Sequence, residues 1–168
     1  MLKKIIIAAI VALPLTISAQ SAKFGYCNSQ DIIPKMQEYV DAEAKLKAVQ
    51  EQYTTEGKKI EDELQKKYQA YEEMSKSTTT TDAQRKTAED ELQALSQKYQ
   101  NFMQAAQQDI QQQQQQQMAP VMQKFNDAVQ SVGKENAFTF IYETTALIYT
   151  GADAQDVTPL VKAKLGVK

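Results

Sequence analysis

The side chains that most often carry acid–base, nucleophilic or metal chemistry are scarce in this sequence. The 168 residues include no histidine and only one cysteine, Cys27. Histidine is the usual general base, the usual activator of a nucleophile and the commonest metal ligand. We therefore predict that the protein is not an enzyme and that it binds no metal or other cofactor.

Carboxylates are plentiful, but they occur in runs. Residues 61–63 and residues 89–91 are each three consecutive acidic side chains within a helical pattern. No histidine or cysteine accompanies either run, and such runs are typical of a solvated helix face. We interpret them as surface charge and not as a catalytic or metal-binding constellation.

Cys27 lies in a short alternating stretch, residues 23–28, that predicts a β-strand. Phe24 and Tyr26 would share one face of this strand. A lone cysteine can form no internal disulfide, and its place in a strand favours a buried, inert thiol. Asn28 or Ser29 is expected to cap a short helix that Pro34 limits.

The first 19 residues have the pattern of an export signal. Lys3 and Lys4 precede an apolar run, residues 5–13, that is too short to span a bilayer. Small residues before Gln20 form a plausible cleavage site, so we predict that residues 1–19 are a signal peptide. Without Lys3 and Lys4, 17 basic residues remain against 21 acidic ones, a net charge of −4. That charge argues against nucleic-acid binding.

Residues 35–135 must position whatever the rest of the chain does. No proline occurs between Lys35 and Ala119, and apolar residues recur at steps of three and four. We predict two antiparallel helices with a bend at residues 75–81, where Thr81 and Gln84 form a capping box. Each helix would be roughly 60 to 75 Å long at 1.5 Å per residue, so the pair must project from a smaller body. The expected seam contains Leu46, Val49, Tyr53, Gly57, Ile60, Leu64, Tyr71 and Met74, and on the second helix Ala88, Leu92, Leu95, Tyr99, Phe102, Ala106 and Ile110.

Three local features modify this arm. Gly57 costs about 1 kcal/mol relative to alanine inside a helix, and it is either tolerated or serves as a soft joint. Residues 111–117 are seven glutamines, which we interpret as a solvated helical stretch. Pro120 should kink the second helix where it rejoins the body.

The C-terminal part changes character. Residues 138–142 and 146–149 each predict a strand, and we expect the two to pair as a hairpin. Thr158 is expected to cap a last helix with Pro159 at its first position. That helix, residues 160–165, would present Leu160, Val161 and Leu165 to the body.

The predicted fold class is therefore α+β and mostly α: a long helical hairpin, residues 35–135, on a β-rich body, residues 20–34 and 136–168. Three short strands make a marginal sheet alone, and their aromatic faces exceed what one small helix can cover. We expect the body to be completed by oligomerisation. The residues expected to build it are Phe24, Tyr26, Phe138, Phe140, Tyr142, Leu147 and Tyr149.

The order of these segments resembles the Skp (OmpH-like) family of periplasmic chaperones. The matching pieces are an export signal, Phe24-Gly25-Tyr26, the amphipathic hairpin, residues 133–142, and residues 147–149 and 156–158 before the last helix. The resemblance implies a periplasmic homotrimer whose arms enclose a cavity. There, unfolded outer-membrane β-barrel proteins are held without ATP. Family members are typically basic, which this chain is not.

Client contacts would come from adaptable or amphipathic side chains on the arm. The candidates are Tyr68, Tyr71, Met74, Tyr99, Phe102 and Met103. The alternative is that they only hold the two helices together, and we expect this of most of them. Lys76, Arg85 and Lys86 at the tip predict at most a weak contact with a membrane surface, or ordinary helix-end charge. The alternative function is a coiled-coil spacer of the cell envelope.

Overall fold

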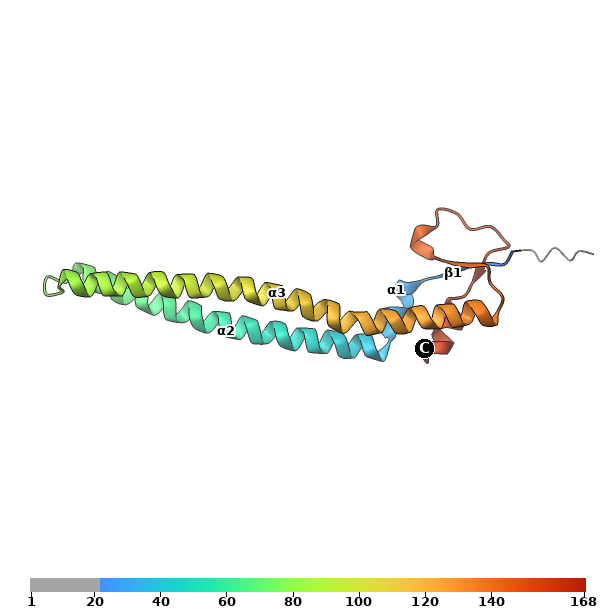
Figure 1. Ribbon diagram of the computed structural model, residues 1–168, viewed down its shortest axis with the longest axis horizontal. Helices are drawn as coiled ribbons and strands as arrows, with labels where there is room; N and C mark the ends of the chain where they lie inside the picture. The colour runs from blue at the N-terminus through green and yellow to red at the C-terminus, as the bar shows by residue number, and fades with distance from the viewer. Residues whose placement is uncertain (1–21) are drawn as a thin grey trace, which may run out of the picture.

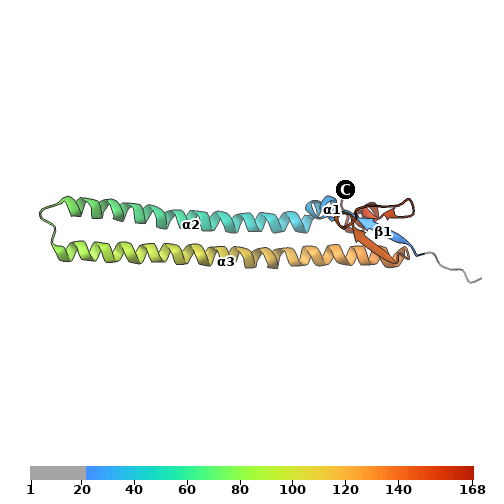
Figure 2. The same cartoon turned by 90° about the horizontal axis from the view of Figure 1, so that it is seen from above.

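The computed structural model describes residues 22–168, so the predicted signal peptide lies outside the described residues. Two long helices form an arm, and the segments that precede and follow them, residues 22–36 and 136–168, meet in a body at one end of it (Figures 1 and 2). No helix among residues 22–168 is long and apolar enough to cross a membrane. In chain order the elements are β1 (Phe24–Cys27), α1 (Ser29–Ile32), the 3₁₀ turn η1 (Ile33–Lys35), α2 (Gln37–Lys76), α3 (Asp82–Glu135), β2 (Phe140–Glu143), the 3₁₀ turn η2 (Thr144–Ala146), β3 (Gln155–Asp156) and α4 (Thr158–Leu165).

The arm is the predicted antiparallel pair, formed by the 40 residues of α2 and most of the 54 residues of α3. Figure 2 shows the two helices side by side along their shared length. At 1.5 Å per residue, α3 is about 80 Å long. Its last turns run past the start of α2 and into the body, so the arm and the body share one continuous helix.

The tip is closed by local hydrogen bonds, as the capping pattern predicted. Thr81 Oγ1 accepts a hydrogen bond from Gln84 N at 3.3 Å, and Gln84 Oε1 accepts one from Thr81 N at 2.9 Å. Arg85 Nη2 donates to the carbonyl oxygens of Ser77 and Thr80. These contacts satisfy backbone groups that the helix ends leave unpaired.

Pro120 does not break α3, which continues as one helix to Glu135. The predicted kink is reduced to a gentle change of direction near the point where α3 turns from yellow to orange (Figure 1). Proline removes the hydrogen bond to the carbonyl four residues earlier, that of Gln116. Gln116 and Pro120 are both exposed, so water can satisfy this carbonyl.

The body contains a three-stranded parallel sheet in the order β2-β1-β3. In its register Phe24 lies beside Phe140, and Tyr26 lies beside Tyr142. The arm is therefore the long crossover that a parallel β1–β2 pair requires.

The predicted hairpin between residues 138–142 and 146–149 is wrong. Residues 144–146 form η2, residues 147–154 form no strand, and the third strand is β3. The physical reason is that β2 takes β1 as its partner on one side, while η2 turns the chain away from its other edge. The apolar residues 146–149 thus pair with no strand in the described part of the chain.

The last helix begins two residues before the predicted range 160–165, and its cap lies one residue earlier than predicted. Val157 occupies the cap position, and Thr158 is the first helical residue. Thr158 Oγ1 instead accepts a hydrogen bond from Asn28 N at 3.0 Å. Val161 is fully buried, but Leu160 is 45% exposed and does not face the body as expected, because α4 turns only one stripe toward the core.

The core of the body joins segments from both ends of the chain to α3. Ile32 and Met36 from the N-terminal side pack with Val157 and Val161 from the C-terminal side. The residues of α3 in this core, Val121, Phe125, Ala128 and Val132, recur at helical spacing. Cys27 lies in the same core, where burial raises the pKa of its thiol to about 11, as expected of an inert cysteine.

A charged cluster fastens α1 to α4. Asp31 accepts hydrogen bonds from Lys162 and Lys35, which lower the pKa of its carboxyl from 3.8 to about 2. A lowered pKa means that the charged carboxylate stabilises the folded state above about pH 4. This contribution is lost as the pH falls toward 2.

We predict that replacing Asp31 with asparagine flattens the dependence of body stability on pH between about 4 and about 2. Urea unfolding followed by tyrosine fluorescence at a series of pH values would measure it. Asp153→Asn is the control, since Asp153 is exposed and forms no ion pair among residues 22–168. Equal acid sensitivity of the wild type and Asp31→Asn would contradict the assigned role.

Candidate functional site

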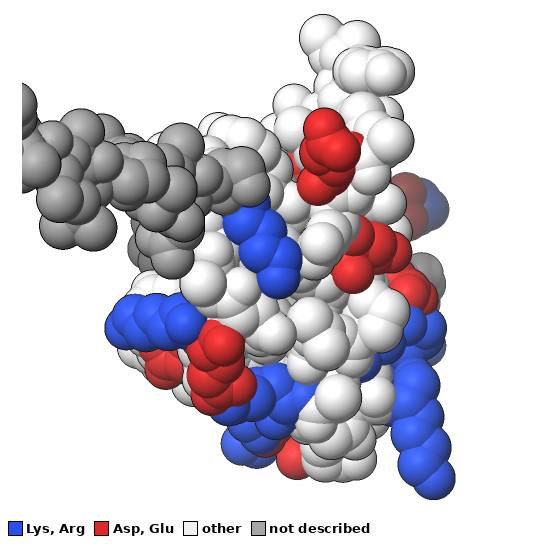
Figure 3. Space-filling view, turned by 90° about the vertical axis from the view of Figure 1, so that its right-hand side faces the viewer, with Lys and Arg blue, Asp and Glu red and all other residues white. Residues whose placement is uncertain are grey.

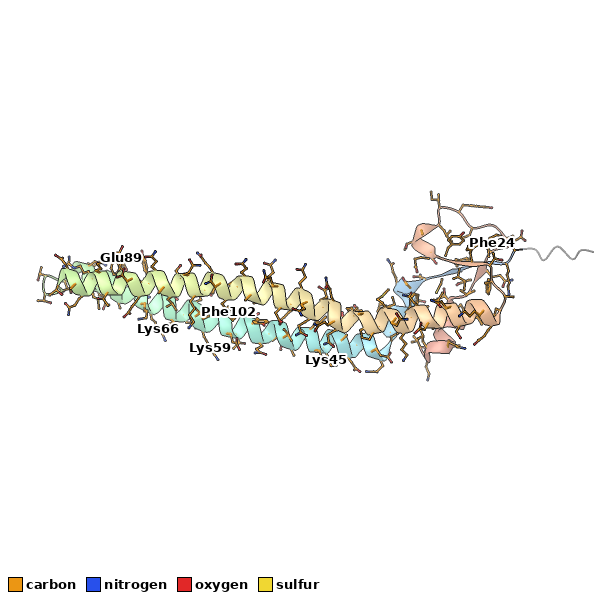
Figure 4. The ribbon with its side chains drawn as sticks, in the orientation of Figure 1. Phe24, Lys45, Lys59, Lys66, Glu89 and Phe102 are labelled. Atoms are coloured by element: carbon orange, nitrogen blue, oxygen red, sulfur yellow. The ribbon has the colours of Figure 1, made fainter. Side chains whose placement is uncertain are left out.

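The outer face of the sheet is aromatic and uncovered. Phe24 and Phe140 stack at 6.3 Å between ring centroids, and Phe140 lies 5.9 Å from Tyr142. These three side chains are 41%, 55% and 45% exposed. Together with the half-buried Tyr26 they form a surface that we call the aromatic face. Figure 4 labels Phe24 at the body end of the molecule.

The alternation of each strand produces this asymmetry. Gly25, Cys27 and Ile141 point the other way, into the body. A Cβ atom at Gly25 would lie 3.1 Å from both the ring of Phe138 and Val157 Cγ1, so glycine permits the close packing beneath the sheet. Phe138 was predicted to belong with the other aromatic residues, but it packs on this inner side beneath Lys23.

Apolar side chains continue beyond the sheet. Leu147 is half-buried, while Ile148 is fully exposed and Tyr149 is 84% exposed. Among residues 22–168, no strand lies beside the outer edge of β2. Figure 3 views the body end-on and shows acidic and basic side chains scattered over it without a patch of one sign.

Ile148 is the residue that sequence reasoning missed. Leu147 and Tyr149 were among the residues expected to build the body, but Ile148 between them was not. The available signal was that residues 146–149 are apolar at every position, a pattern typical of a strand buried on both faces.

The six predicted client-contact residues divide into two groups. Tyr71, Tyr99 and Phe102 are half-buried between α2 and α3. The other three are exposed: Tyr68 at 59%, Met103 at 47% and Met74 at 38%. Figure 4 shows Phe102 at the seam, while Lys45, Lys59, Lys66 and Glu89 point away from it.

The seam of the arm is thin. Only Ala42 and Gly57 of α2 are buried, and between the tip and the Gln run α3 buries Leu95 and Ala106. Polar contacts supplement this packing. The Tyr53 hydroxyl donates to Asp109 at 3.0 Å, which raises the pKa of Tyr53, and Lys67 pairs with Glu91 at 2.5 Å.

The acidic runs lie where the sequence placed them, on exposed helix faces. Among residues 22–168, no group of three or more histidine, cysteine or acidic side chains could hold a metal ion. The described residues present two exposed apolar surfaces, the aromatic face and the exposed arm residues.

Comparison with known proteins finds a matching family model and similar solved structures. A family model described as "Outer membrane protein (OmpH-like)" matches residues 23–165. A crystal structure of a candidate outer membrane chaperone (OmpH-like) from Caulobacter crescentus CB15 has a TM-score of 0.71 at 22% sequence identity. The alignment covers 86% of this chain and 85% of that one, and at this identity it supports the fold alone. Among curated proteins, no sequence matches.

The Tyr53–Asp109 hydrogen bond provides a test of how the arm is held. We predict that Tyr53→Phe lowers the stability of the arm by about 1 kcal/mol, because the ring contact with Phe102 remains while the bond between the helices is lost. Thermal unfolding followed by far-UV circular dichroism measures the change. Tyr39→Phe is the matched control, since its hydroxyl bonds to Glu43 within α2. Equal losses in the two variants would show that the inter-helix bond adds nothing.

Proposed function

The chain belongs to the OmpH-like family of outer membrane proteins, and from this premise we propose that it is a chaperone for unfolded outer-membrane β-barrel proteins. It would hold them without ATP, between helical arms, and so prevent their aggregation. The observation that carries the proposal is the long hairpin arm, with exposed Tyr68, Met74 and Met103, projecting from a small body.

The body is proposed to assemble three copies. Soluble monomers rarely leave a contiguous apolar patch uncovered, and the body exposes Ile148 and Tyr149 in addition to the aromatic face. The open edge of β2 could accept a strand from another copy, with residues 146–149 as the candidate strand. The number three comes from the resemblance to the Skp family.

Client capture is proposed to rest on many weak contacts. Each exposed arm residue offers little affinity alone, but several arms acting on one chain raise the effective concentration of every further contact. Tyr68, Met74 and Met103 are the residues best placed for this role, because they are exposed. Tyr71, Tyr99 and Phe102 would act mainly by holding the seam.

The location proposed is the periplasm, to which residues 1–19 would direct the chain before they are removed. The related protein from Caulobacter crescentus is described as a candidate outer membrane chaperone, which fits that location. The tip offers no excess positive charge in support of a membrane contact, because Lys76, Arg85 and Lys86 lie within 4 Å of Glu72, Asp82 and Asp90. A weak contact there remains a prediction.

The holdase activity can be tested with an outer-membrane β-barrel protein diluted from urea. We predict that the mature chain keeps it soluble without ATP, as measured by light scattering, and that Tyr68→Ser weakens this protection. Tyr68→Phe should retain it, because the exposed ring remains. A protein that leaves several barrel proteins to aggregate but binds one fixed partner would instead be a structural spacer.

The assembly can be tested by mass in solution. We predict a trimer that Phe140→Ser dissociates, since the substitution removes the most exposed ring of the aromatic face. Leu160→Ser is the matched control, because Leu160 is similarly exposed but lies on α4. A monomeric wild type in multi-angle light scattering would overturn the assembly, and equal effects of both variants would remove the aromatic face from it.

A further inference from the structure

A groove lies between the two helices of the arm, about halfway along its length. It lies between residues 50–61 of α2 and residues 99–110 of α3 and has a volume of about 900 Å³. Its apolar lining consists of Tyr53, Gly57, Tyr99, Met103, Ala106 and Ile110. Phe102, which lies beside Gly57, is labelled in Figure 4 and shows where the groove is on the arm.

Packing does not explain the glycine at its floor. A Cβ atom at Gly57 would lie 3.4 Å from Phe102 Cε1 and 3.6 Å from Met103 Sδ, which is close to ordinary contact with two side chains. Gly57 is in the middle of α2 with helical backbone, where alanine is the better helix former. At Gly25, by contrast, an added Cβ atom would lie only 3.1 Å from atoms of Phe138 and of Val157. Gly57 therefore keeps a space open instead of relieving a clash.

The two walls of the groove differ in stiffness. Tyr53 is fixed by its hydrogen bond to Asp109 and by its edge contact with Phe102. Met103 is 47% exposed, and its unbranched thioether can adapt to varied shapes. A fixed wall facing an adaptable one suits apolar side chains of different sizes.

The charges around the groove indicate the occupant. Its rim carries one cation, Lys58, and one anion, Glu61, and is otherwise formed by hydroxyl and amide groups. Along α3, residues 92–123 contain only Lys98 and Asp109 as charged residues. A surface of zero net charge complements an uncharged partner. Glutamine amides can both donate hydrogen bonds to peptide groups and accept hydrogen bonds from them. A surface without excess positive charge does not match an anionic lipid or a nucleic acid.

We propose that this groove binds an apolar side chain of an extended segment of the unfolded β-barrel client. The inference rests on the proposed function and names a binding site for it. Strands of membrane barrels alternate apolar and polar residues, so one apolar side chain can enter while its neighbours face the amide rim. Gly57 supplies the depth, and Met103 closes over the occupant.

The test fills the groove without weakening the arm. Gly57→Ala should raise the melting temperature of the arm and yet weaken binding of a barrel protein, diluted from urea, by about fivefold. Thr55→Ala is the matched control: Thr55 is on the same helix, exposed and outside the groove, so it should leave binding unchanged. Fluorescence anisotropy of a labelled client gives both affinities.

A second pair of variants separates an open groove from a flexible joint at Gly57. Met103→Ser removes the adaptable wall and leaves the backbone of α2 untouched, so it should weaken binding by a similar factor. Met122→Ser, at a comparably exposed methionine outside the groove, should not. Loss of binding in Gly57→Ala alone would overturn the groove in favour of a joint.

The failure of this inference is distinguishable from that of the proposed function. A wild type that binds no unfolded barrel protein removes the chaperone role. A wild type that binds well, while Gly57→Ala and Met103→Ser bind equally well, removes only the groove.

Discussion

The structure depends on the burial of the last turns of α3. Val121, Phe125, Ala128 and Val132 form a single apolar stripe, and segments from both ends of the chain pack against it. The same helix, from Asp82 up to this stripe, forms one half of the arm. Because the helix is continuous through Pro120, the direction of the arm is set by the packing of the body. The core that joins the two ends of the chain also fixes how the arm projects.

The body uses this core on one side only. Gly25, Cys27 and Ile141 face α3 and α4, while Phe24, Phe140 and Tyr142 face outward. Two strands of four residues and one of two make a small sheet, and such a sheet gains stability when its second face is covered. An uncovered second face explains why the aromatic side chains of the sheet are exposed although they are apolar. We propose that other copies of the chain cover this face, since they carry the same surface chemistry.

The arm is held together differently from the body. Few of its residues are buried, and contacts such as Tyr53 with Asp109 and Lys67 with Glu91 join its helices through polar groups. Elements with few buried apolar contacts are the ones that open most readily in folded proteins. A thin seam leaves apolar side chains such as Tyr68 and Met103 free for contact outside the arm. The groove at Gly57 has the same consequence, because glycine lowers the stability of α2 and leaves apolar surface accessible between the helices.

The sequence by itself determined the long-range plan. Apolar periodicity predicted α2 and α3, Thr81 and Gln84 predicted the tip, and the alternation of residues 23–28 predicted β1 with Cys27 buried. These features are local, because they depend on helical and strand spacing and on capping within a few residues. The order of segments also sufficed to indicate the family.

Only the tertiary structure decided which strands pair and which aromatic residues are covered. Alternation is the same for a strand in a hairpin and for one in a parallel pair, so it could not choose β1 over residues 146–149 as the partner of β2. Likewise, Phe138 and Phe140 are both aromatic, yet one packs on Gly25 and the other faces outward. The same holds for Leu160 and Val161, which are neighbours on α4 with opposite exposure. Pairing and burial join residues more than 100 positions apart, and such contacts leave no local signal in the chain.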